Sequence, residues 1–473
     1  MRASASVAGA AGQYSPSKRT GLVFSGTGTH GVYHAGVLRA LQEAGVRVDV
    51  VAGHGIGAVT ATLAALDGGA TLWDEGGLWL ASRVSQYYRW RWPLRLAAWL
   101  MALLAGVLLI PVAVLVAGAL AYAAGFLLAL AGASSGEWLV GLVSARTAAA
   151  FSGSELPTLV PRLAVLVLFA LVLALAAGVV IFARPQGGMS RTSEGRWWWR
   201  LVSSPLDTAP LRDAVVRILW TRVRGAGTAA RPSSVALSRR LSEVLTENMG
   251  QPGCRELLLG VTDLDARRDL VGAALSAPFQ EAFFASQPGR ERGAEVLDLT
   301  GSGKDVVVDL LDGALTPALG AEAHACPLPS DGYWAGETHR TCDRPGMVAR
   351  LLAELDTADV VQVIVVSAAA PALQPHRLKA PRVDPRSRLG EYFTASESAA
   401  IDDAVSVARN QFDAVYLIRP SHNPVGPFEG SGVHDPGSDR HRSLAELRQQ
   451  GYTDAYAQFI DPVVGASGEH LGA

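Results

Sequence analysis

A glycine-rich turn between two apolar segments is the first feature of this sequence that could do chemistry. Residues 46–52 are β-branched and typical of a strand, residues 56–66 are typical of a helix, and the turn between them consists of Gly53, His54, Gly55, Ile56 and Gly57. A serine at residue 55 would be a nucleophile presented on a strained strand-to-helix turn. Because glycine has no side chain, the turn predicts the position of a nucleophile without supplying one.

A second glycine-rich segment precedes this turn and carries polar side chains that could take part in chemistry. His54 and one histidine of this segment are candidate general bases or phosphate ligands, and its threonines are candidate hydroxyl nucleophiles. The segment consists of Gly26, Thr27, Gly28, Thr29, His30 and Gly31.

The elements around these two segments alternate between strand and helix. An apolar strand at residues 21–24 precedes a helix at about 31–44, and the strand and helix around the turn follow it. Further along, residues 256–263 and 360–366 are apolar and strand-like, the second after a helical pattern. This order predicts a doubly wound α/β sheet.

Residues 25–61, "SGTGTHGVYHAGVLRALQEAGVRVDVVAGHGIGAVTA", resemble the opening region of the patatin-like phospholipases. That family has a G-G-G-x-R-G loop, a helix, and a strand leading to G-x-S-x-G. The resemblance implies a three-layer α/β/α domain in which a serine–aspartate dyad cleaves lipid esters beside an oxyanion loop. This sequence departs from the pattern at Thr27, His30 and Gly55. An old loss of the nucleophile is the favoured interpretation, and an isolated serine-to-glycine change is the alternative.

The resemblance also implies a dyad aspartate in a D-G-[GA] turn. Asp331, followed by Gly332, lies in the expected succession and is the preferred candidate, whereas Asp312 in Asp312-Gly313-Ala314 is the literal match but comes earlier. The segment "LLLGVTDLD" resembles the family's central strand, so its two aspartates are not taken as metal ligands. We predict no metal and no cofactor.

Two apolar runs interrupt the α/β pattern. Hydrophobic residues make up 49% of the chain, and no charged residue lies between Arg95 and Glu137. The runs at about 95–131 and 163–183 each reach the ~20 residues that cross a bilayer. The first is expected to be one long helix, with a tight hairpin as the alternative. Arginines cluster before the first run and after the second, which places both flanks in the cytoplasm and residues 134–160 outside it.

Aromatic residues flank the same two ends and are typical of an interfacial belt. They are Tyr87, Tyr88, Trp90, Trp92 and Trp197 to Trp199. The sequence thus predicts an N-terminal disordered tail, a patatin-like domain in two parts, a membrane hairpin between them, and an irregular C-terminal tail. Their expected ranges are 1–20 for the first tail, 21–92 and 185–420 for the domain, 93–184 for the hairpin and 421–473 for the last tail.

Three functions remain open from the sequence. The first is a degenerate lipid acyl hydrolase that binds membrane lipid, a fatty-acyl group or phospholipid, or acts as a scaffold. The second is an active hydrolase that uses another nucleophile or activated water. The third is a membrane scaffold for a protein partner. A net charge of −2 gives no indication of nucleic-acid binding. The expected location is the bacterial inner membrane, with the α/β domain and both termini in the cytoplasm.

Overall fold

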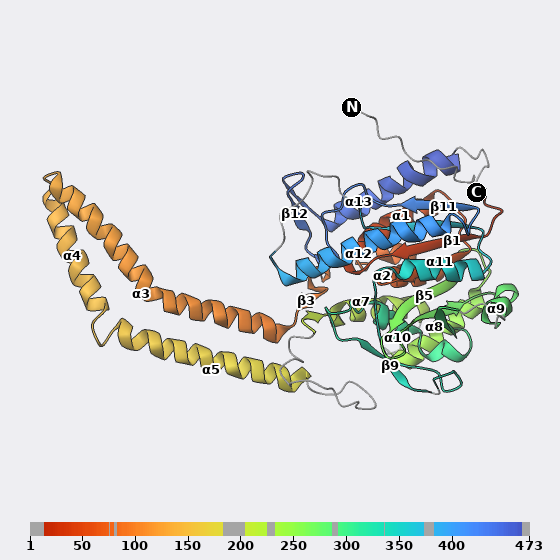
Figure 1. The fold of residues 1–473 in the computed structure, drawn as a ribbon, viewed down its shortest axis with the longest axis horizontal. Helices are drawn as coiled ribbons and strands as arrows, with labels where there is room; N and C mark the ends of the chain where they lie inside the picture. Colours follow the sequence, from red (N-terminus) through yellow and green to blue (C-terminus); the bar gives the residue numbers. More distant parts are fainter. Residues whose placement is uncertain are drawn as a thin grey trace. The chain divides into compact units, whose positions relative to one another are not determined.

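The chain forms two compact units. The computed structural model describes residues 14–74, 76–79, 83–182, 204–224, 232–285, 292–334, 336–372 and 383–465. An α/β unit contains the described residues up to Arg89 and those from Leu206 onward, and a helical unit begins at Trp90. Figure 1 shows the elements of both units.

A mixed sheet with a parallel centre forms the middle of the α/β unit. Its strands follow the order β11-β10-β1-β2-β5-β6-β7, with β9 paired to the end of β5 and β8 paired to β9. Their bounds are β1 Thr20–Ser25, β2 Val50–His54, β5 Glu256–Asp263, β6 Arg268–Ala274, β7 Ala294–Asp298, β8 His324–Pro327, β9 Thr338–Cys342, β10 Gln362–Ser367 and β11 Ala414–Ile418. The described shorter strands are β3 Arg89–Trp90, β4 Leu206–Asp207, β12 Val433–Asp435 and β13 Arg440–Arg442.

Strands from both sides of the helical unit share this sheet. β2, which precedes the unit in sequence, pairs in parallel with β5, which follows it, from Val50 opposite Glu256 to His54 opposite Gly260. β1 pairs in parallel with β2 and with β10. The α/β unit is therefore one folded domain that the helical unit interrupts.

Helices cover both faces of the sheet, because alternate strand residues are buried on opposite sides. Leu22 and Phe24 of β1 belong to one core cluster, and Val23 between them belongs to the other. The first cluster includes side chains of α1 Gly31–Glu43, α2 Ile56–Ala65, α7 Ala209–Val223, α8 Ser234–Asn248, α10 Val307–Ala314, α13 Leu444–Ala455 and the π-helical turn η5 Tyr456–Val464. The second includes those of α9 Ala277–Phe284, α11 Met347–Thr357 and most of α12 Pro385–Ala408. The short 3-10 turns are η1 Gly28–His30, η2 Gly69–Leu72, η3 Val84–Gln86 and η4 Ser302–Asp305.

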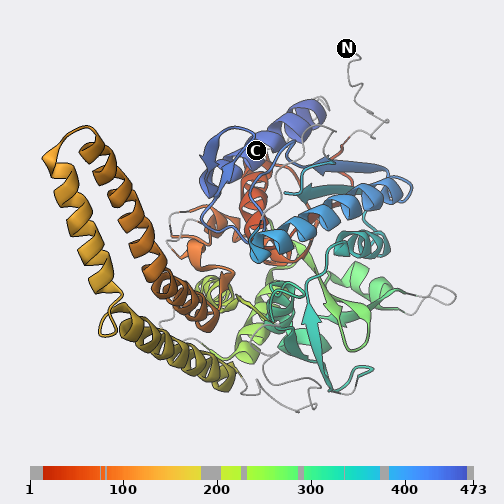
Figure 2. The same ribbon diagram turned by 60° about the vertical axis from the view of Figure 1, so that its left-hand side comes forward.

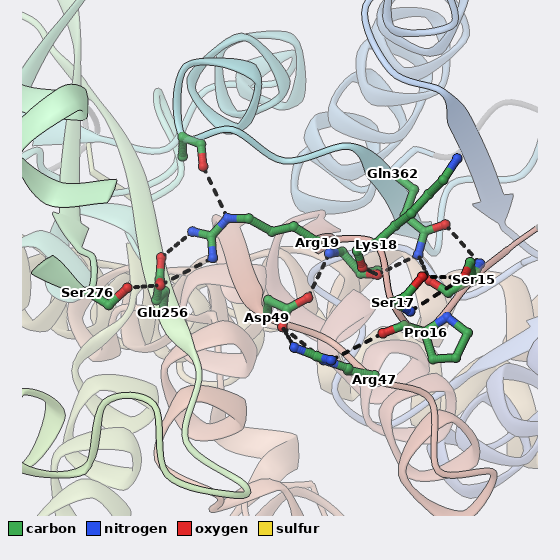
Figure 3. Close-up of polar contacts among 12 residues, drawn as sticks. Ser15, Pro16, Ser17, Lys18, Arg19, Arg47, Asp49, Glu256, Ser276 and Gln362 are labelled. Atoms are coloured by element: carbon green, nitrogen blue, oxygen red, sulfur yellow. Dashed lines mark hydrogen bonds and ion pairs between the residues drawn. The ribbon is translucent and has the colours of Figure 1, made fainter. Parts of the chain in front are cut away.

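A charged clamp joins the two parts of the domain at the amino-terminal edge of the parallel strands (Figure 3). The guanidinium of Arg19, directly before β1, donates to both carboxylate oxygens of Glu256 at 3.3 and 2.5 Å. Ser276 donates a further hydrogen bond of 2.6 Å to Glu256, and the Arg19 guanidinium lies 3.5 Å from the centre of the Phe279 ring. Both charged side chains are largely buried, so the pair is shielded from solvent.

The helical unit consists of α3 Trp92–Leu130, α4 Ser134–Ala150 and α5 Leu156–Phe182. α3 packs against both other helices, as Figures 1 and 2 show. Gly125 approaches Val140, and Gly118 approaches Thr147, so α4 runs back along the second half of α3. The first apolar run is thus one continuous helix with Pro111 inside it.

Residues 134–160 differ from the expected connecting loop because α4 occupies most of them. Alanine and leucine, which have high helix propensity, recur in α4 and favour a helix there. The expected aromatic belt also needs correction at Tyr87 and Tyr88, which are buried in the α/β unit and donate to the carbonyls of Leu78 and Leu315. Trp197 to Trp199 lie outside the described residues.

Both predicted tails contain ordered structure. Tyr14 is buried against the rings of Tyr416 and Phe459, so residues 14–20 are ordered, unlike the disordered tail expected there. The irregular tail expected over residues 421–473 contains β12, β13, α13 and η5, and α13 packs along α1. The glycine and proline content of residues 420–437 led to the prediction of irregular structure throughout. The helix that follows, α13, begins with a capping box at Ser443 and Glu446 that was not recognised in the sequence.

Candidate active site

Gly55 lies at the turn where β2 ends and α2 begins. Its backbone has φ +57° and ψ −135°, a conformation that side-chain-bearing residues rarely adopt. Gly55 is the N-cap of α2, and its carbonyl accepts a hydrogen bond of 3.2 Å from Ala58. The turn therefore has the strained geometry of a nucleophile elbow, and glycine adopts it with the least strain.

The space that a side chain at residue 55 would need is already filled. A Cβ built on Gly55 would lie 2.7 Å from Oδ2 of Asp343 and would overlap the carbonyl oxygen of Gly26. The same Gly26 carbonyl accepts a hydrogen bond of 3.0 Å from the N–H of Ile56, the residue after the vacant position. The glycine-rich loop therefore closes over the elbow and occupies one of its backbone donors.

The carboxylate that faces Gly55 belongs to Asp343, directly after β9. Asp343 Oδ2 accepts a hydrogen bond from the Thr27 hydroxyl, and Oδ1 lies 3.1 Å from His54 Nδ1. Its N–H donates to the Thr316 carbonyl at 2.8 Å, which fixes the backbone behind it. Antiparallel pairing of β9 with the end of β5 brings Asp343 to the edge of the sheet where β2 also ends.

This placement corrects the expected position of Asp331. Asp331 is exposed in the connection between β8 and β9, before the strand that carries Asp343 to the site. Asp312, the alternative, is half-buried within α10, where burial raises its pKa. The dipeptide Asp331-Gly332 matches the family pattern in sequence. It lies before β9, however, and only the residue after β9, Asp343, lies beside Gly55.

A second buried carboxylate lies on the other side of His54. Glu397 of α12 is 4% exposed, and its Oε1 lies 3.2 Å from His54 Nε2. The hydroxyl of Ser25, the last residue of β1, donates to Glu397 and lies 2.9 Å from the same nitrogen of His54. Oε2 of Glu397 accepts the N–H of Gly346 at 3.3 Å. His54 thus bridges two carboxylates from different segments of the chain.

The charge of His54 follows from these neighbours. Burial alone would lower its pKa, but the electrostatic effect of Glu397 and the hydrogen bonds of both carboxylates outweigh burial and raise the pKa to about 10. His54 is therefore an imidazolium near neutral pH. A protonated histidine has no free lone pair, so His54 in this state does not act as a general base.

Both donors of Thr29 in the glycine-rich loop are also occupied. The N–H of Thr29 donates to the Pro427 carbonyl at 2.8 Å, and its hydroxyl donates to the Gly426 carbonyl at 2.6 Å. Gly28 has φ +59°, and a side chain there would collide with the Pro427 carbonyl. A segment from the far end of the chain therefore packs directly on the glycine-rich loop.

His30 and His34 are buried beside this loop and uncharged near neutral pH. Burial lowers the pKa of His30 to about 4, although a hydrogen bond to the backbone of Val425 opposes the shift. Burial and the neighbouring His30 lower the pKa of His34 to about 3. A neutral, fully buried His30 does not offer the positive charge that a headgroup phosphate would require.

Asp343, Glu397 and Ser25 were missed by motif matching. Glu397 carried a usable signal: it lies at helical spacing among buried residues of α12, between Phe393 and Ile401, and an acidic residue on an apolar face needs a buried partner. Asp343 gave a weaker signal in the sequence, because no glycine follows it and it does not match the D-G pattern. The described residues contain no group of three or more side chains placed to bind a metal ion.

These features define a class of protein: an α/β domain with a nucleophile elbow, a glycine-rich loop and a facing carboxylate, without the nucleophile. Residues 22–112 match the family described as patatin-like phospholipase. This segment of the chain is thus similar to the patatin-like phospholipase family.

Two fungal lysophospholipases match a short segment of the chain. The lysophospholipase nte1 of Emericella nidulans is 48% identical over 50 residues, which cover 11% of this chain and 3% of that protein. Lysophospholipase NTE1 of Coccidioides immitis is 44% identical over the same length and coverage. The chain thus spans about 3% of the length of these curated relatives.

Among solved structures, the crystal structure of VipD from Legionella pneumophila is similar at 14% identity and a TM-score of 0.33. The match covers 95% of this chain and 67% of that one.

Proposed function

We propose that this protein is a membrane-anchored, non-hydrolytic member of the patatin-like family that acts as a scaffold at a lipid surface. The observation that supports the loss of catalysis is the closed elbow. The Gly55 position is blocked by Gly26 and Asp343, and the loop donors of Thr29 bind the chain's own carbonyls. The two donors of Thr29 are therefore not free to bind the oxyanion of an ester.

The helical unit supports anchoring in a bilayer. α3 and α5 contain windows of mean hydropathy 2.8 and 3.1, of which 6% and 22% are buried. Large apolar side chains on both helices are exposed, and exposed apolar surface of this extent is unstable in water. We infer that α3 and α5 form the two membrane-spanning segments, with the two parts of the α/β domain on one side of the membrane.

The proposed ligand class is phospholipid or lysophospholipid at the membrane surface. Support comes from the family match and from the fungal relatives, which are named lysophospholipases. Because the elbow is closed, we place lipid contact on the helical unit and propose that the α/β domain presents its surface to a protein partner.

One contact favours a second candidate, an active hydrolase with a displaced nucleophile. The hydroxyl of Thr27 donates to Oδ2 of Asp343. This oxygen lies 2.7 Å from the position that a Cβ would take at Gly55. Asp343 could accept the proton of Thr27 during attack on an ester carbonyl. Two features oppose this function: Thr27 is 5% exposed, and His54 already neutralises Asp343.

The test is turnover of a short-chain ester and of lysophosphatidylcholine by the purified full chain in detergent micelles. We expect no turnover above that of buffer, and the same result for Thr27→Val and Asp343→Asn. Turnover that Thr27→Val abolishes would establish the displaced nucleophile. Turnover that survives Thr27→Val but is lost in Asp343→Asn would indicate water activated by Asp343, and either result would refute the non-hydrolytic function.

A further inference from the structure

The segment from Asn423 to Glu429 crosses the glycine-rich loop and is hereafter called the strap. Its residues lie far in sequence from the elbow, and the family match ends long before them. Two of its carbonyls, from Gly426 and Pro427, accept hydrogen bonds from the hydroxyl and the N–H of Thr29 at 2.6 and 2.8 Å. The strap therefore occupies both donors of Thr29 in this loop.

The strap is fastened at both ends. At its start, the Asn423 amide donates to the Ala368 carbonyl at 3.0 Å, and its side-chain oxygen accepts the N–H of Val425 at 3.0 Å. At its other end, the Phe428 ring is 1% exposed and lies 5.1 Å from the Tyr88 ring and 5.8 Å from the Phe393 ring, centre to centre. Such ring pairs stabilise a fold by about 0.5–1.5 kcal/mol beyond the area that they bury.

The loop fits the strap closely. Gly28 adopts φ +59° directly beneath the Pro427 carbonyl, with no room for a side chain between them. Val425 is 2% exposed, and its backbone is hydrogen-bonded to His30 of the same loop. Carbonyl oxygens of the chain itself thus lie directly against Gly28 and Thr29 of the loop.

We propose that the strap is an internal plug that holds the glycine-rich loop closed by giving the donors of Thr29 peptide carbonyls as partners. This inference rests on the proposed function and deepens it, since it assigns the closed state to a specific contact. In consequence, restoring a serine at residue 55 leaves the loop donors occupied. Loosening the strap, in contrast, frees the N–H of Thr29.

Hydrogen–deuterium exchange of the Thr29 amide in the full chain, followed by mass spectrometry in detergent micelles, tests the plug. Phe428→Ala removes the ring that seats one end, and Asn423→Ala removes the hydrogen bonds at the other. We expect each variant to accelerate exchange of the Thr29 amide by at least about 10-fold, which corresponds to the loss of about 1.4 kcal/mol of protection. Tyr333→Ala, an aromatic truncation at a side chain that is 85% exposed, is the matched control and leaves Thr29 unchanged.

Unchanged exchange at Thr29 in both strap variants would overturn the plug, because the loop would then stay closed without it. Asn423→Ala keeps the test decisive if Phe428→Ala fails to fold, as Asn423 is only partly buried. The measurement is independent of the proposed function: a hydrolytically active wild-type chain refutes that function through turnover, whereas the plug is judged by amide exchange alone.

Discussion

His54 is the residue on which the charge balance of the elbow depends. Its imidazolium lies between Asp343 and Glu397, and all three side chains are at most 5% exposed. His54→Leu leaves two buried carboxylates without their cation, and breaking a buried ion pair from one side costs about 3–5 kcal/mol. We therefore expect a loss of that size in the free energy of unfolding, measured by urea titration in micelles. His434→Leu, at a side chain that is 64% exposed, is the control and should change it by less than about 0.5 kcal/mol.

The same residue predicts a pH dependence of stability. Its pKa in the folded chain is about 10 against an ordinary value of 6.5, so the folded state binds the proton more tightly than the unfolded state. The stabilisation is complete below pH 6.5 and is lost as the pH rises through about 10. We expect the urea midpoint to fall between pH 7 and 10 in the wild type and to fall less in His54→Leu. A midpoint that rises over this interval in the wild type would contradict a protonated His54.

Gly55 predicts the outcome of restoring a nucleophile. A side chain there would overlap the Gly26 carbonyl and would occupy a backbone conformation with φ +57°. Such strain costs about 1–3 kcal/mol. We expect Gly55→Ser to lower the free energy of unfolding by about that amount and to show no esterase turnover. Gly332→Ser, at an exposed turn without positive φ, is the control and should be nearly neutral. Ester turnover by Gly55→Ser alone would mean that the loop opens without loosening of the strap.

At the scale of elements, the local apolar pattern predicted the strands and helices around Gly55, whereas the D-G motif did not predict the aspartate that faces it. The strand–turn–helix succession of residues 20–66 is visible in the sequence because apolar periodicity and glycine turns are local properties. The partner of Gly55 is not local. Asp343 reaches the site through the pairing of β9 with β5, and Glu397 reaches it because α12 packs on the sheet. Neither contact can be inferred from residue spacing. The sequence therefore predicted the turn at Gly55 but predicted Asp331, instead of Asp343, as the carboxylate that faces it.

The clamp between β1 and β5 gives a prediction for the interrupted domain. Arg19→Met leaves the buried Glu256 without its cation, and we expect a loss of about 3–5 kcal/mol in the free energy of unfolding. Lys18→Met is a matched control one residue away, because Lys18 pairs with Asp413 at side chains that are 39% and 59% exposed, where an ion pair contributes about 0–1 kcal/mol. Equal losses in the two variants, measured by the same urea titration, would show that Arg19 does not join the two parts of the domain.

At the scale of the whole molecule, the length of α3 exceeds what one crossing requires. Its 39 residues extend about 58 Å at 1.5 Å per residue, against a hydrocarbon core of about 30 Å. α5, with 27 residues, is closer to the length of one crossing. Since α4 packs along the second half of α3, only the first half of α3 is free to pair with α5 along its length. The apolar second half with α4 then forms a hairpin of its own at one end of the helical unit.

This arrangement predicts the side of the membrane on which the turn between α4 and α5 lies. Both parts of the α/β domain share one sheet, so two crossings would return the chain to the side from which it left. In the proposed topology that side is the cytoplasm, which the arginines before the first apolar run favour. We expect a cysteine introduced by Gly153→Cys, in this exposed turn, to react with an impermeant maleimide added to intact bacterial cells. Asp439→Cys, at a fully exposed side chain of the α/β domain, should react only after permeabilisation. The chain without an added cysteine gives the background labelling of the native cysteines, Cys254, Cys326 and Cys342. Labelling of Gly153→Cys that also requires permeabilised cells would show that the helical unit does not cross the bilayer twice, and the proposed anchoring would then be wrong.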